Sequence, residues 1–432
     1  MEKASSISKF YQKSREERLA LLTERAFLSE ETAKLLFNAK GLSEEVANHL
    51  IENQISQFTL PMGVALNFIV DGEECLIPMV TEEPSVIAAC SNAARFTRAT
   101  GGFKTSFPER LQTGQMIFYN LEDFSEGKRL IEQRIDEIKQ LAQLAHPSIV
   151  ARGGGLVDLK AHIIYNEKDQ AEYLTVYLFV DVKEAMGANI VNTILEGVTP
   201  VIQEWLRAEK LMSILSNYND RALVSSSCSI PFNQLATKEL SGDVVAEKIV
   251  KASHYAKLDP YRAVTHNKGM MNGIDAVVMA TGNDTRAIEA GIHAYAAKDG
   301  RYQGLTNWYI DSKSNCLIGE LTLPLLLGSL GGAINALPLA KASQELLQTH
   351  DAEILGRIIC SVGLAQNFAA IRALVTEGIQ KGHMSLHASA LAIHAGAVGD
   401  EIEAIASQLR LLERMNLKTA SDLLTVYRQQ NS

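Results

Sequence analysis

The order of strand and helix patterns between residues 111 and 219 constrains the fold more than any other feature of this sequence. Apolar residues alternate in some segments and recur at a spacing of three and four in others, which distinguishes strands from helices. The expected elements are a strand at 115–121, a helix from an N-cap at Ser125 to Pro147, strands at 157–163 and 173–182, a helix at 184–206 and a strand at 211–215. This β-α-β-β-α-β order is the signature of a ferredoxin-like split βαβ unit. We therefore predict a self-contained α+β domain at 111–219 that is inserted into a larger chain.

The sequence on both sides of this unit predicts a mostly helical large domain. Ser29 and Ser43 are each followed by acidic residues, as the N-caps of helices are. Further helices are expected at 243–257 and from Asp284 onward, and the polar pattern after residue 376 predicts a small helical, mobile cap. A chain of 432 residues is expected to form two or three domains. We divide it into segments 1–110, 111–219, 220–375 and 376–432.

Charge and cysteine content exclude several classes of protein. The net charge of -9 argues against a nucleic-acid partner, because phosphate binding needs concentrated Lys and Arg. The polar N-terminus lacks the apolar core of a signal peptide. The most apolar stretch, 321–340, is long enough to span a bilayer, but its glycines and prolines indicate a buried loop. The five cysteines are widely spaced and form no CxxC pair, so we expect no disulfides, no zinc knuckle and a cytoplasmic protein without membrane contact.

The familiar fingerprints for dinucleotides and phosphates are absent. No GxGxxG follows a strand and no GxxxxGK[ST] is present, so neither a Rossmann site nor a P-loop is supported. The run 182–189, Val-Lys-Glu-Ala-Met-Gly-Ala-Asn, lies where a strand is expected to become a helix. Its small residues would let a phosphate approach free backbone N–H groups at the positive end of that helix. Close strand–helix packing at Gly187 would explain the same residues.

Three other clusters carry side chains suited to chemistry. Lys268 and Asp284 are each flanked by Gly and Asn, which suits a preorganised charged pair on tight loops, although a solvated surface pair has the same sequence. Glu83 stands in a Glu-Glu-Pro turn, where it is either solvated or buried and able to donate a proton. The last cluster holds His383, His387 and His394. It has no HExxH arrangement and no nearby carboxylate, so we expect no metal and instead one titrating histidine that acts as a general acid.

Taken in order, these clusters resemble class II 3-hydroxy-3-methylglutaryl-CoA (HMG-CoA) reductases from about residue 50 to the end of the chain. The matching motifs lie at 52–61, 81–85 (Thr-Glu-Glu-Pro-Ser), 184–193, 259–263 (Asp-Pro-Tyr-Arg-Ala), 265–269 (Thr-His-Asn-Lys-Gly), 282–284 (Gly-Asn-Asp) and 382–384 (Gly-His-Met). Two departures are small, since Glu184 replaces the family's aspartate and Thr285 stands where many relatives have Trp. The resemblance implies a NAD(P)H-dependent oxidoreductase of the mevalonate pathway of isoprenoid biosynthesis. It also implies a homodimer with the active site at the subunit interface.

The resemblance places Glu83, Lys268, Asp284 and His383 on the family's four catalytic positions. The family reduces the thioester of HMG-CoA to mevalonate in two hydride steps, consuming two nicotinamide cofactors and releasing CoA. Lys268 would stabilise the oxyanion that forms at the carbonyl, and Asp284 would hold Lys268 charged and oriented. His383 would protonate the departing CoA thiolate from a cap that closes after binding. Glu83 would donate the proton at the aldehyde stage.

The same resemblance assigns the binding residues. Ser85 and Arg262 match positions that contact the hydroxymethylglutaryl group, and Arg262 suits its free carboxylate. The dinucleotide-binding region of the small domain is matched by Glu184, Met186, Gly187, Asn189 and Asn217. His146 stands near the point where NAD-using relatives carry an aspartate that repels a ribose 2′-phosphate. A histidine does not repel this phosphate, so the sequence favours NADPH, with NADH as the alternative.

Three alternative functions stay open at the level of the sequence. An acyl-CoA transferase or synthase would use a cysteine nucleophile such as Cys90 or Cys228, but neither neighbourhood supplies a base. A catalytically inactive relative would serve as a binding protein, against which the four catalytic matches argue. Within the family, the reaction could run oxidatively and degrade mevalonate with NAD, against which His146 argues.

Overall fold

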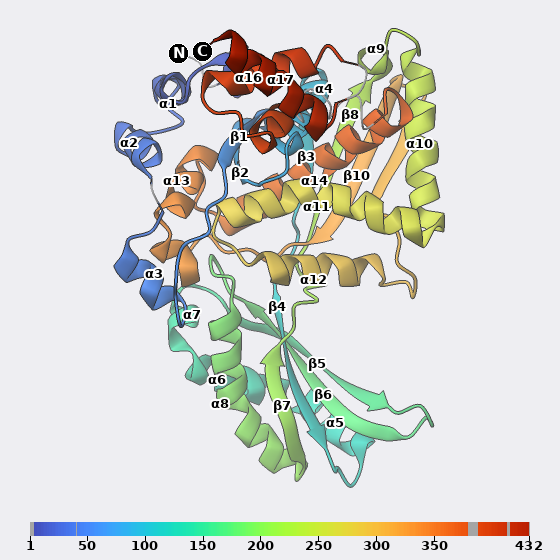
Figure 1. Cartoon of the computed structure of the whole chain (residues 1–432). Helices are drawn as coiled ribbons and strands as arrows, with labels where there is room; N and C mark the ends of the chain where they lie inside the picture. Colours follow the sequence, from blue (N-terminus) through green and yellow to red (C-terminus); the bar gives the residue numbers. More distant parts are fainter. Residues whose placement is uncertain (1–3, 40, 379–387, 413–414, 432) are drawn as a thin grey trace.

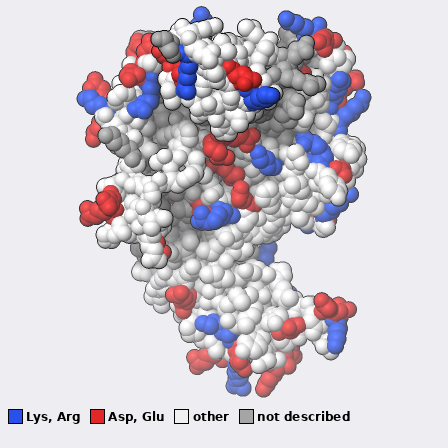
Figure 2. All heavy atoms as spheres, viewed as in Figure 1, with Lys and Arg blue, Asp and Glu red and all other residues white. Residues whose placement is uncertain are grey.

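The computed structural model describes residues 4–39, 41–378, 388–412 and 415–431. It has two bodies, a large domain that holds both ends of the chain and a small domain that projects from it (Figure 1). The large domain contains a six-stranded sheet and most of the helices, and the small domain contains a four-stranded sheet. Acidic and basic side chains are interspersed over both bodies on the face shown in Figure 2. The fold is therefore mixed α+β, as predicted.

The small domain follows the predicted β-α-β-β-α-β order, with its first helix divided. Its elements are β4 (Gln112–Tyr119), α5 (Phe124–Gln133), α6 (Ile135–Ala145), α7 (Pro147–Ala151), β5 (Gly155–Tyr165), β6 (Ala171–Asp181), α8 (Ala188–Leu206) and β7 (Glu209–Leu215). The strands pair antiparallel in the order β5-β6-β4-β7. Met116 and Phe118, two positions apart on β4, are both fully buried, as the alternation of side chains along a strand requires.

The helices of the small domain begin at residues other than those predicted. The first is capped by Asp123, whose Oδ1 accepts hydrogen bonds from the backbone N–H groups of Ser125 (2.8 Å) and Glu126 (3.0 Å), so the expected cap at Ser125 is wrong. This helix is interrupted at Arg134, where α5 ends and α6 begins. The predicted helix at 184–206 begins only at Ala188, because Gly187 has a left-handed φ of 93° that ends the preceding turn.

The large domain is built on the six-stranded sheet. Its strands are β1 (Met62–Val70), β2 (Glu73–Val80), β3 (Phe103–Ser106), β8 (Leu223–Pro231), β9 (Thr306–Asp311) and β10 (Cys316–Pro324). They pair in the order β2-β1-β3-β8-β10-β9, antiparallel throughout except for β1 with β3. Cys228 of β8 lies opposite Phe103 on one side and Gly319 on the other, so the two halves of the sheet meet at this strand.

Helices cover this sheet and fill the large domain. They are η1 (Phe10–Gln12), α1 (Arg15–Glu24), α2 (Glu30–Asn38), α3 (Glu44–Leu50), α4 (Val86–Thr97), η2 (Arg98–Thr100), α9 (Phe232–Leu235), α10 (Gly242–Leu258), α11 (Pro260–Ala280), α12 (Thr285–Ala296), η3 (Gly332–Ala336), α13 (Pro338–Leu347) and α14 (Ala352–Val375). Ser29 and Ser43 cap α2 and α3 as predicted, because each hydroxyl accepts a hydrogen bond from the backbone N–H three residues on. Asp284 likewise caps α12, the helix predicted to begin near it.

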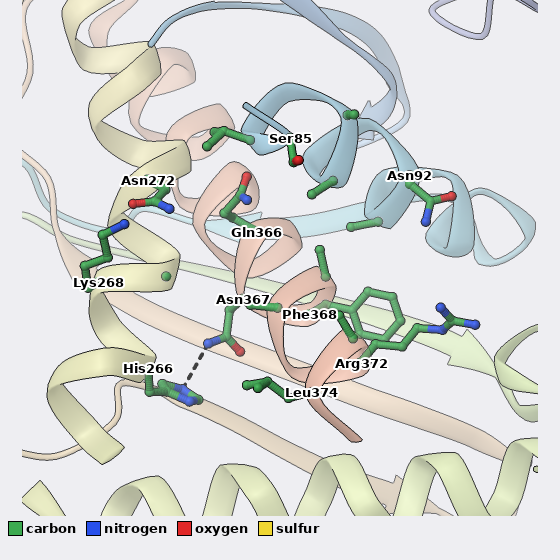
Figure 3. Close-up of a pocket in the computed structure, with 18 of the residues that line it drawn as sticks. Ser85, Asn92, His266, Lys268, Asn272, Gln366, Asn367, Phe368, Arg372 and Leu374 are labelled. Carbon is green, nitrogen blue, oxygen red and sulfur yellow. Dashed lines mark hydrogen bonds between the residues drawn. The ribbon is translucent and has the colours of Figure 1, made fainter. Parts of the chain in front are cut away.

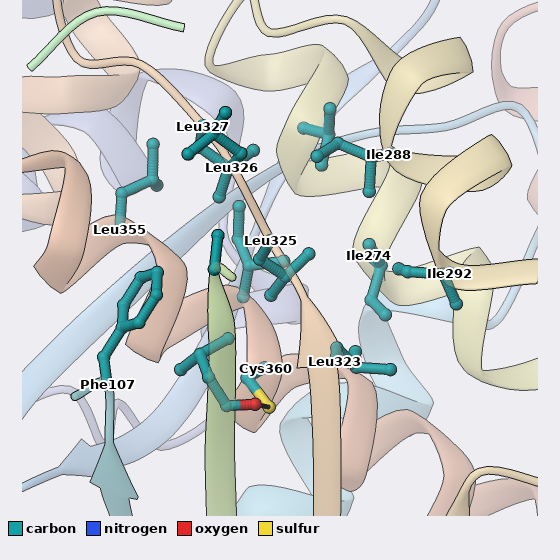
Figure 4. Packing of buried hydrophobic residues seen from close by; sticks show 14 of the residues in the cluster. Phe107, Ile274, Ile288, Ile292, Leu323, Leu325, Leu326, Leu327, Leu355 and Cys360 are labelled. Atoms are coloured by element: carbon teal, nitrogen blue, oxygen red, sulfur yellow. Dashed lines mark hydrogen bonds between the residues drawn. The ribbon is translucent and has the colours of Figure 1, made fainter. Parts of the chain in front are cut away.

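α14 is a central helix of the large domain. By length and composition alone it could cross a membrane, yet 67% of its most apolar window is buried inside the protein. It packs against α11, α4 and β8, and its Leu355 and Cys360 lie among the leucines that end and follow β10 (Figure 4). The apolar stretch 321–340 is only in part the predicted loop, because it begins in β10 and ends in η3 and α13. Both stretches therefore belong to the core.

α11 overturns the expectation of tight loops around Lys268. It is a continuous helix of 21 residues, capped by Asp259, whose Oδ2 accepts a hydrogen bond from the backbone N–H of Arg262 (2.8 Å). Gly273 lies inside this helix, and a Cβ atom there would lie 3.0 Å from Val362 of α14. Gly273 therefore allows α11 and α14 to pack closely, and the expected tight loop around Lys268 is wrong.

The described C-terminal residues form a small unit around their own core. It contains α16 (Asp400–Leu409) and α17 (Leu417–Gln430), and in Figure 1 it lies at the top beside the beginning of the chain. Its buried apolar residues are Ala388, Leu391, Ala392, Ala397, Ile405, Ala406, Leu409, Ala420 and Leu424. The segment is helical, as its pattern predicted.

Two chain segments connect the domains, and they lie side by side. Residues 107–111 lead from β3 into β4, and residues 216–222 lead from β7 back into β8. The backbone N–H of Leu111 donates to the carbonyl oxygen of Arg221 (2.9 Å), and the Arg221 guanidinium pairs with Glu109 (2.5 Å). The small domain is thus joined to the large domain at one narrow junction.

Candidate active site

A pocket of about 580 Å³ lies between α4, α11 and α14 in the large domain (Figure 3). One wall comes from the first half of α11, another from α4 and the loop before it, and a third from the second half of α14. Polar residues that line it include Glu83, Ser85, Arg262, His266, Lys268 and Asn272. The structure thus brings together four residues that the sequence assigned to one site, from segments that are up to 185 positions apart.

An ion pair between Glu83 and Lys268 lies on the polar side of the pocket. The Nζ atom of Lys268 donates to Oε2 of Glu83 at 3.0 Å, and the amide of Asn272 donates to the same oxygen at 3.3 Å. Both charged side chains stay partly exposed, 62% for Lys268 and 38% for Glu83. An ammonium with further donors beside a carboxylate can stabilise a developing oxyanion and transfer a proton. Asn272 was missed by the sequence reasoning, although it stands four residues after Lys268 on the same helix face.

Ser85 contributes an unsatisfied hydroxyl to the pocket. It precedes α4 with a left-handed φ of 78°, a conformation that is strained for a non-glycine residue. Its Oγ is buried and has no hydrogen-bond partner among the described residues. A buried hydroxyl without a partner costs free energy that a ligand could recover. The strained backbone and the free hydroxyl together point to ligand binding.

Arg262 brings a cation into the same pocket from the first turn of α11. Burial lowers the pKa of its guanidinium from the ordinary value. Within the described part of the chain, no carboxylate pairs with this group. A half-buried guanidinium without a counter-charge suits an anionic ligand, and a carboxylate could accept two parallel hydrogen bonds from it.

A buried polar network supports the wall that carries Lys268. The Nε2 atom of His266 lies 2.6 Å from Oγ1 of Thr306 and 3.0 Å from the amide nitrogen of Asn367. Burial, followed by the charge of Arg262, lowers the pKa of His266 to about 3, so its ring is neutral at pH 7. The network joins α11 to β9 and α14 and fixes the helix two residues before Lys268. His266 was assigned no role of its own from the sequence, because nothing local shows that it is buried.

Asp284 lies away from this pocket, at the N-cap of α12. Its Oδ1 accepts hydrogen bonds from two backbone N–H groups at the start of that helix (3.0 and 3.2 Å), and it pairs with the side chain of Arg286 (3.2 Å). The predicted pair of Lys268 with Asp284 is not formed within the described chain, where Lys268 pairs with Glu83. The reason is geometric, because α11 continues from Lys268 to Ala280, a rise of about 18 Å along its axis.

The predicted general acid falls in a part of the chain that the structure leaves out. His383 and His387 lie within residues 379–387, outside the described residues, so the role of His383 stays a prediction. His394 is described and is exposed. Across the described ranges, no group of three or more His, Cys, Asp or Glu side chains is placed to hold a metal ion.

The run predicted to bind the cofactor connects β6 to α8 at the junction between the domains. Gly187 is the N-cap of α8, and a Cβ atom there would lie 2.6 Å from Val182, so no larger residue fits. Oε2 of Glu184 accepts hydrogen bonds from Oγ of Ser329 and from the backbone N–H of Ala352, both at 2.7 Å. Oε2 of Glu184 is therefore engaged within the protein, and the role of Glu184 in binding the cofactor stays a prediction.

Three of the other predicted cofactor residues lie near the junction between the domains, and His146 lies at the end of α6. Met186 packs against the loop after β10, where a Cβ atom on Gly328 would lie 2.9 Å from its Cγ. Asn189 is exposed in the first turn of α8, and Asn217 is exposed in the segment that returns to the large domain. His146 ends α6 further out, where its Nδ1 lies 3.2 Å from the hydroxyl of Ser148.

The two cysteines considered as nucleophiles are buried. Burial raises the pKa of Cys228 to about 12 and also raises the pKa of Cys90. A thiol in this state is not a nucleophile at neutral pH. The structure therefore speaks against a cysteine-dependent transferase.

Comparison with known proteins gives one consistent family. Residues 14–388 match the family model of hydroxymethylglutaryl-coenzyme A reductase. The chain is 44% identical over 421 residues to the 3-hydroxy-3-methylglutaryl-coenzyme A reductase of Archaeoglobus fulgidus, covering 98% of this chain and 94% of that protein. It is 34% identical over 352 residues to a probable 3-hydroxy-3-methylglutaryl-coenzyme A reductase of Borreliella burgdorferi, covering 81% of this chain and 79% of that protein.

Solved structures agree in fold over most of the chain. The 3-hydroxy-3-methylglutaryl-coenzyme A reductase of Streptococcus pneumoniae is similar with a TM-score of 0.84 at 45% identity, covering 98% of this chain and 100% of that one. A structure of the class II reductase of S. pneumoniae bound to NADPH, in open conformations, gives a TM-score of 0.83 at 46% identity, covering 86% and 100%. The fold and the charged pocket are those of an oxidoreductase with an inserted α+β domain. The chain belongs to the hydroxymethylglutaryl-coenzyme A reductase family.

Proposed function

We propose that this protein reduces HMG-CoA to mevalonate and CoA with two NADPH, as an enzyme of the mevalonate pathway. The observation that carries the proposal is the ion pair of Lys268 with Glu83 in the pocket. The same pocket holds the unsatisfied hydroxyl of Ser85 and the guanidinium of Arg262. Membership of the family supplies the reaction, and these side chains supply the charges and hydrogen bonds that it needs.

Each group in the pocket has a step that suits its chemistry. Arg262 would bind the free carboxylate of the hydroxymethylglutaryl group, and Ser85 would form a hydrogen bond to the same group. Lys268 would stabilise the oxyanion that forms when the thioester carbonyl is reduced. Glu83, 3.0 Å from Lys268, would deliver the proton at the aldehyde stage, and His383 would protonate the CoA thiolate.

We infer a homodimer in which each active site receives Asp284 from the second copy. Within one chain, Asp284 lies beyond the far end of α11 from Lys268 and cannot orient it. The segment between α3 and β1 exposes two large apolar side chains, Ile55 at 98% and Phe58 at 94%. Apolar side chains exposed to this degree mark a surface that another chain covers. A second copy seated there would complete the site.

NADPH would bind at the junction of the domains, against the first turn of α8. The residues fit such a ligand, because the N-cap of α8 is Gly187, which has no side chain to cap the N-terminal N–H groups. NADPH supplies the hydride, and the protein supplies a helix N-terminus for the phosphates. The S. pneumoniae relative is bound to NADPH, and His146 carries no negative charge against a 2′-phosphate. We therefore do not propose the reverse, NAD-dependent degradation of mevalonate.

We place the enzyme in the cytoplasm, because its five cysteines are free thiols.

The test of function is the loss of NADPH absorbance after HMG-CoA is added, measured in parallel with NADH. Oxidation of two NADPH per thioester, faster than with NADH, is the expected result. Faster oxidation of NADH would overturn the assignment of the cofactor, and no oxidation of either would overturn the activity.

A further inference from the structure

Arg110 lies in the first segment that crosses between the domains and reaches toward two loops. Its guanidinium donates to the carbonyl oxygens of Lys183 and Leu327 and, at 3.0 Å, to that of Ala185. Two of these acceptors belong to the run 182–187 before α8, and the third belongs to the loop after β10. One planar group with several N–H donors therefore holds two loops together, which a lysine could not do with the same geometry.

The run 182–187 needs such external support. Lys183 has a left-handed φ of 52°, a conformation that is strained for a non-glycine residue and persists only where its surroundings hold it. The carbonyl oxygen of Glu184 accepts hydrogen bonds from the backbone N–H groups of Ser329 (2.9 Å) and Leu330 (3.2 Å). Together with the carboxylate of Glu184, these contacts dock the run on residues 327–330.

Residues 327–330 are held in turn by Asn283, the residue before Asp284. The amide of Asn283 donates to the carbonyl oxygen of Gly328 (3.0 Å) and accepts from its backbone N–H (2.7 Å). Gly328 also has no room for a side chain, because a Cβ atom would lie 2.7 Å from the backbone nitrogen of Met186. The contacts therefore run without a break from Asp284, through Asn283 and Gly328, to the start of α8.

We propose that Arg110 is a positioning residue for hydride transfer. By holding the run 182–187 on residues 327–330, it sets the place of the cofactor-binding helix N-terminus relative to Asp284. This inference rests on the proposed binding of NADPH at the junction. A misplacement of about 1 Å between reacting groups can cost on the order of 100-fold in rate, so a buried residue far from the substrate can have a large effect.

The test compares Arg110→Met and Arg110→Lys with Arg221→Met in the full-length protein. Arg221 lies in the other crossing segment, and within the described residues its ion-pair partners are Glu109 and Asp158, neither of which belongs to the two loops, so it controls for loosening of the junction. We expect Arg110→Met to lower kcat on the order of 10- to 100-fold and to weaken NADPH binding, which is followed by the fluorescence of NADPH. The KM for HMG-CoA should stay unchanged, and Arg110→Lys should be intermediate. Arg221→Met should stay within about twofold of wild type for both ligands.

Amide hydrogen exchange gives a second measurement that needs no cofactor. Residues 182–187 should exchange faster in Arg110→Met than in wild type, and in Arg221→Met they should not. Should Arg110→Met fail to fold, Ser329→Ala removes one contact of Glu184 and should weaken NADPH binding in the same direction. Unchanged NADPH affinity, or an equal loss of affinity for HMG-CoA, would overturn the role of Arg110. Failure of the wild-type protein to bind NADPH would instead overturn the proposed function.

Discussion

Lys268 donates one hydrogen bond to Glu83 and keeps further donors toward the pocket. We expect Lys268→Ala to lower kcat by about 100-fold or more, because the oxyanion loses its positive partner. The side chain is 62% exposed, so the fold and the proposed dimer should persist. Lys251→Ala, on the 79% exposed side chain of α10, is the matched control and should keep wild-type turnover. Near-normal NADPH oxidation by Lys268→Ala would contradict the assignment of the oxyanion partner.

Asp275 is a half-buried carboxyl group on α11 that the proposed reaction does not use. Burial, together with the charge of Glu289, raises its pKa to about 8. The folded protein thus keeps a proton that the unfolded chain releases near pH 4. The stabilising contribution is complete below that pH and is lost as the pH rises through 8.

Asp275→Asn cannot ionise and should therefore stabilise the protein at high pH. We expect a melting temperature higher by roughly 2–4 °C at pH 8, with a smaller difference at pH 5. Asp299→Asn, at an exposed residue, should leave the melting temperature unchanged at both pH values. A shift of the same size at pH 5 and pH 8 would show that the pKa of Asp275 is not raised.

Single residues of the site could be predicted where a motif carries them. Glu83, Ser85, Arg262 and Lys268 were assigned to one site from sequence, and the structure places them in one pocket. Arg110 could not be found in this way, because its acceptors are backbone carbonyls that leave no trace in residue types. The catalytic roles themselves stay predictions.

At the scale of helices, the two glycines of α11 that flank Asn272 differ in their surroundings. A Cβ atom on Gly269 would have its nearest neighbour at 3.8 Å, whereas one on Gly273 would lie 3.0 Å from Val362 of α14. We expect Gly269→Ala to stabilise the protein by about 0.5–1 kcal/mol through helix propensity. Gly273→Leu should destabilise it by about 1–3 kcal/mol through overpacking. Urea unfolding measures both, and equal effects would contradict the proposed close packing.

Helices and strands were predicted well where the periodicity of apolar residues determines them, and poorly where a single contact determines where an element begins or continues. The strands of the small domain follow from alternation, and their order was correct. The helix start at Asp123 was missed, because Asp123 and Ser125 are both good caps and only the fold shows which one is used. α11 was missed because glycines inside it were expected to form loops, whereas Gly273 serves helix packing against α14, about 90 residues further along the chain.

At the scale of the whole molecule, a dimer that shares Asp284 has a direct genetic test. Lys268→Ala and Asp284→Ala should each be inactive as homodimers. A mixture refolded together forms heterodimers with one doubly altered site and one intact site, so about a quarter of wild-type activity should return at random pairing. Mixing Lys268→Ala with Glu83→Ala, two residues of the same chain's pocket, is the control and should restore nothing. Equal recovery in both mixtures, or none in either, would contradict the exchange of Asp284.

The inserted small domain could be predicted from sequence because its β-α-β-β-α-β order is complete within one continuous segment. The pocket could not be predicted as a shape, since its three walls come from α4, α11 and α14. The separation of Lys268 from Asp284 could not be predicted either, because it depends on the length of α11, and the glycines within α11 had indicated loops instead of a helix.

The adjacent entry and exit of the small domain have an evolutionary consequence. Because residues 107–111 and 216–222 pair with each other, the ends of the insert lie close together whatever lies between them. A domain with neighbouring ends can be exchanged as a cassette without stretching its host. Recombination at these two borders could therefore replace the small domain, and with it the preference for NADPH or NADH. The large-domain pocket that binds the thioester would be inherited unchanged.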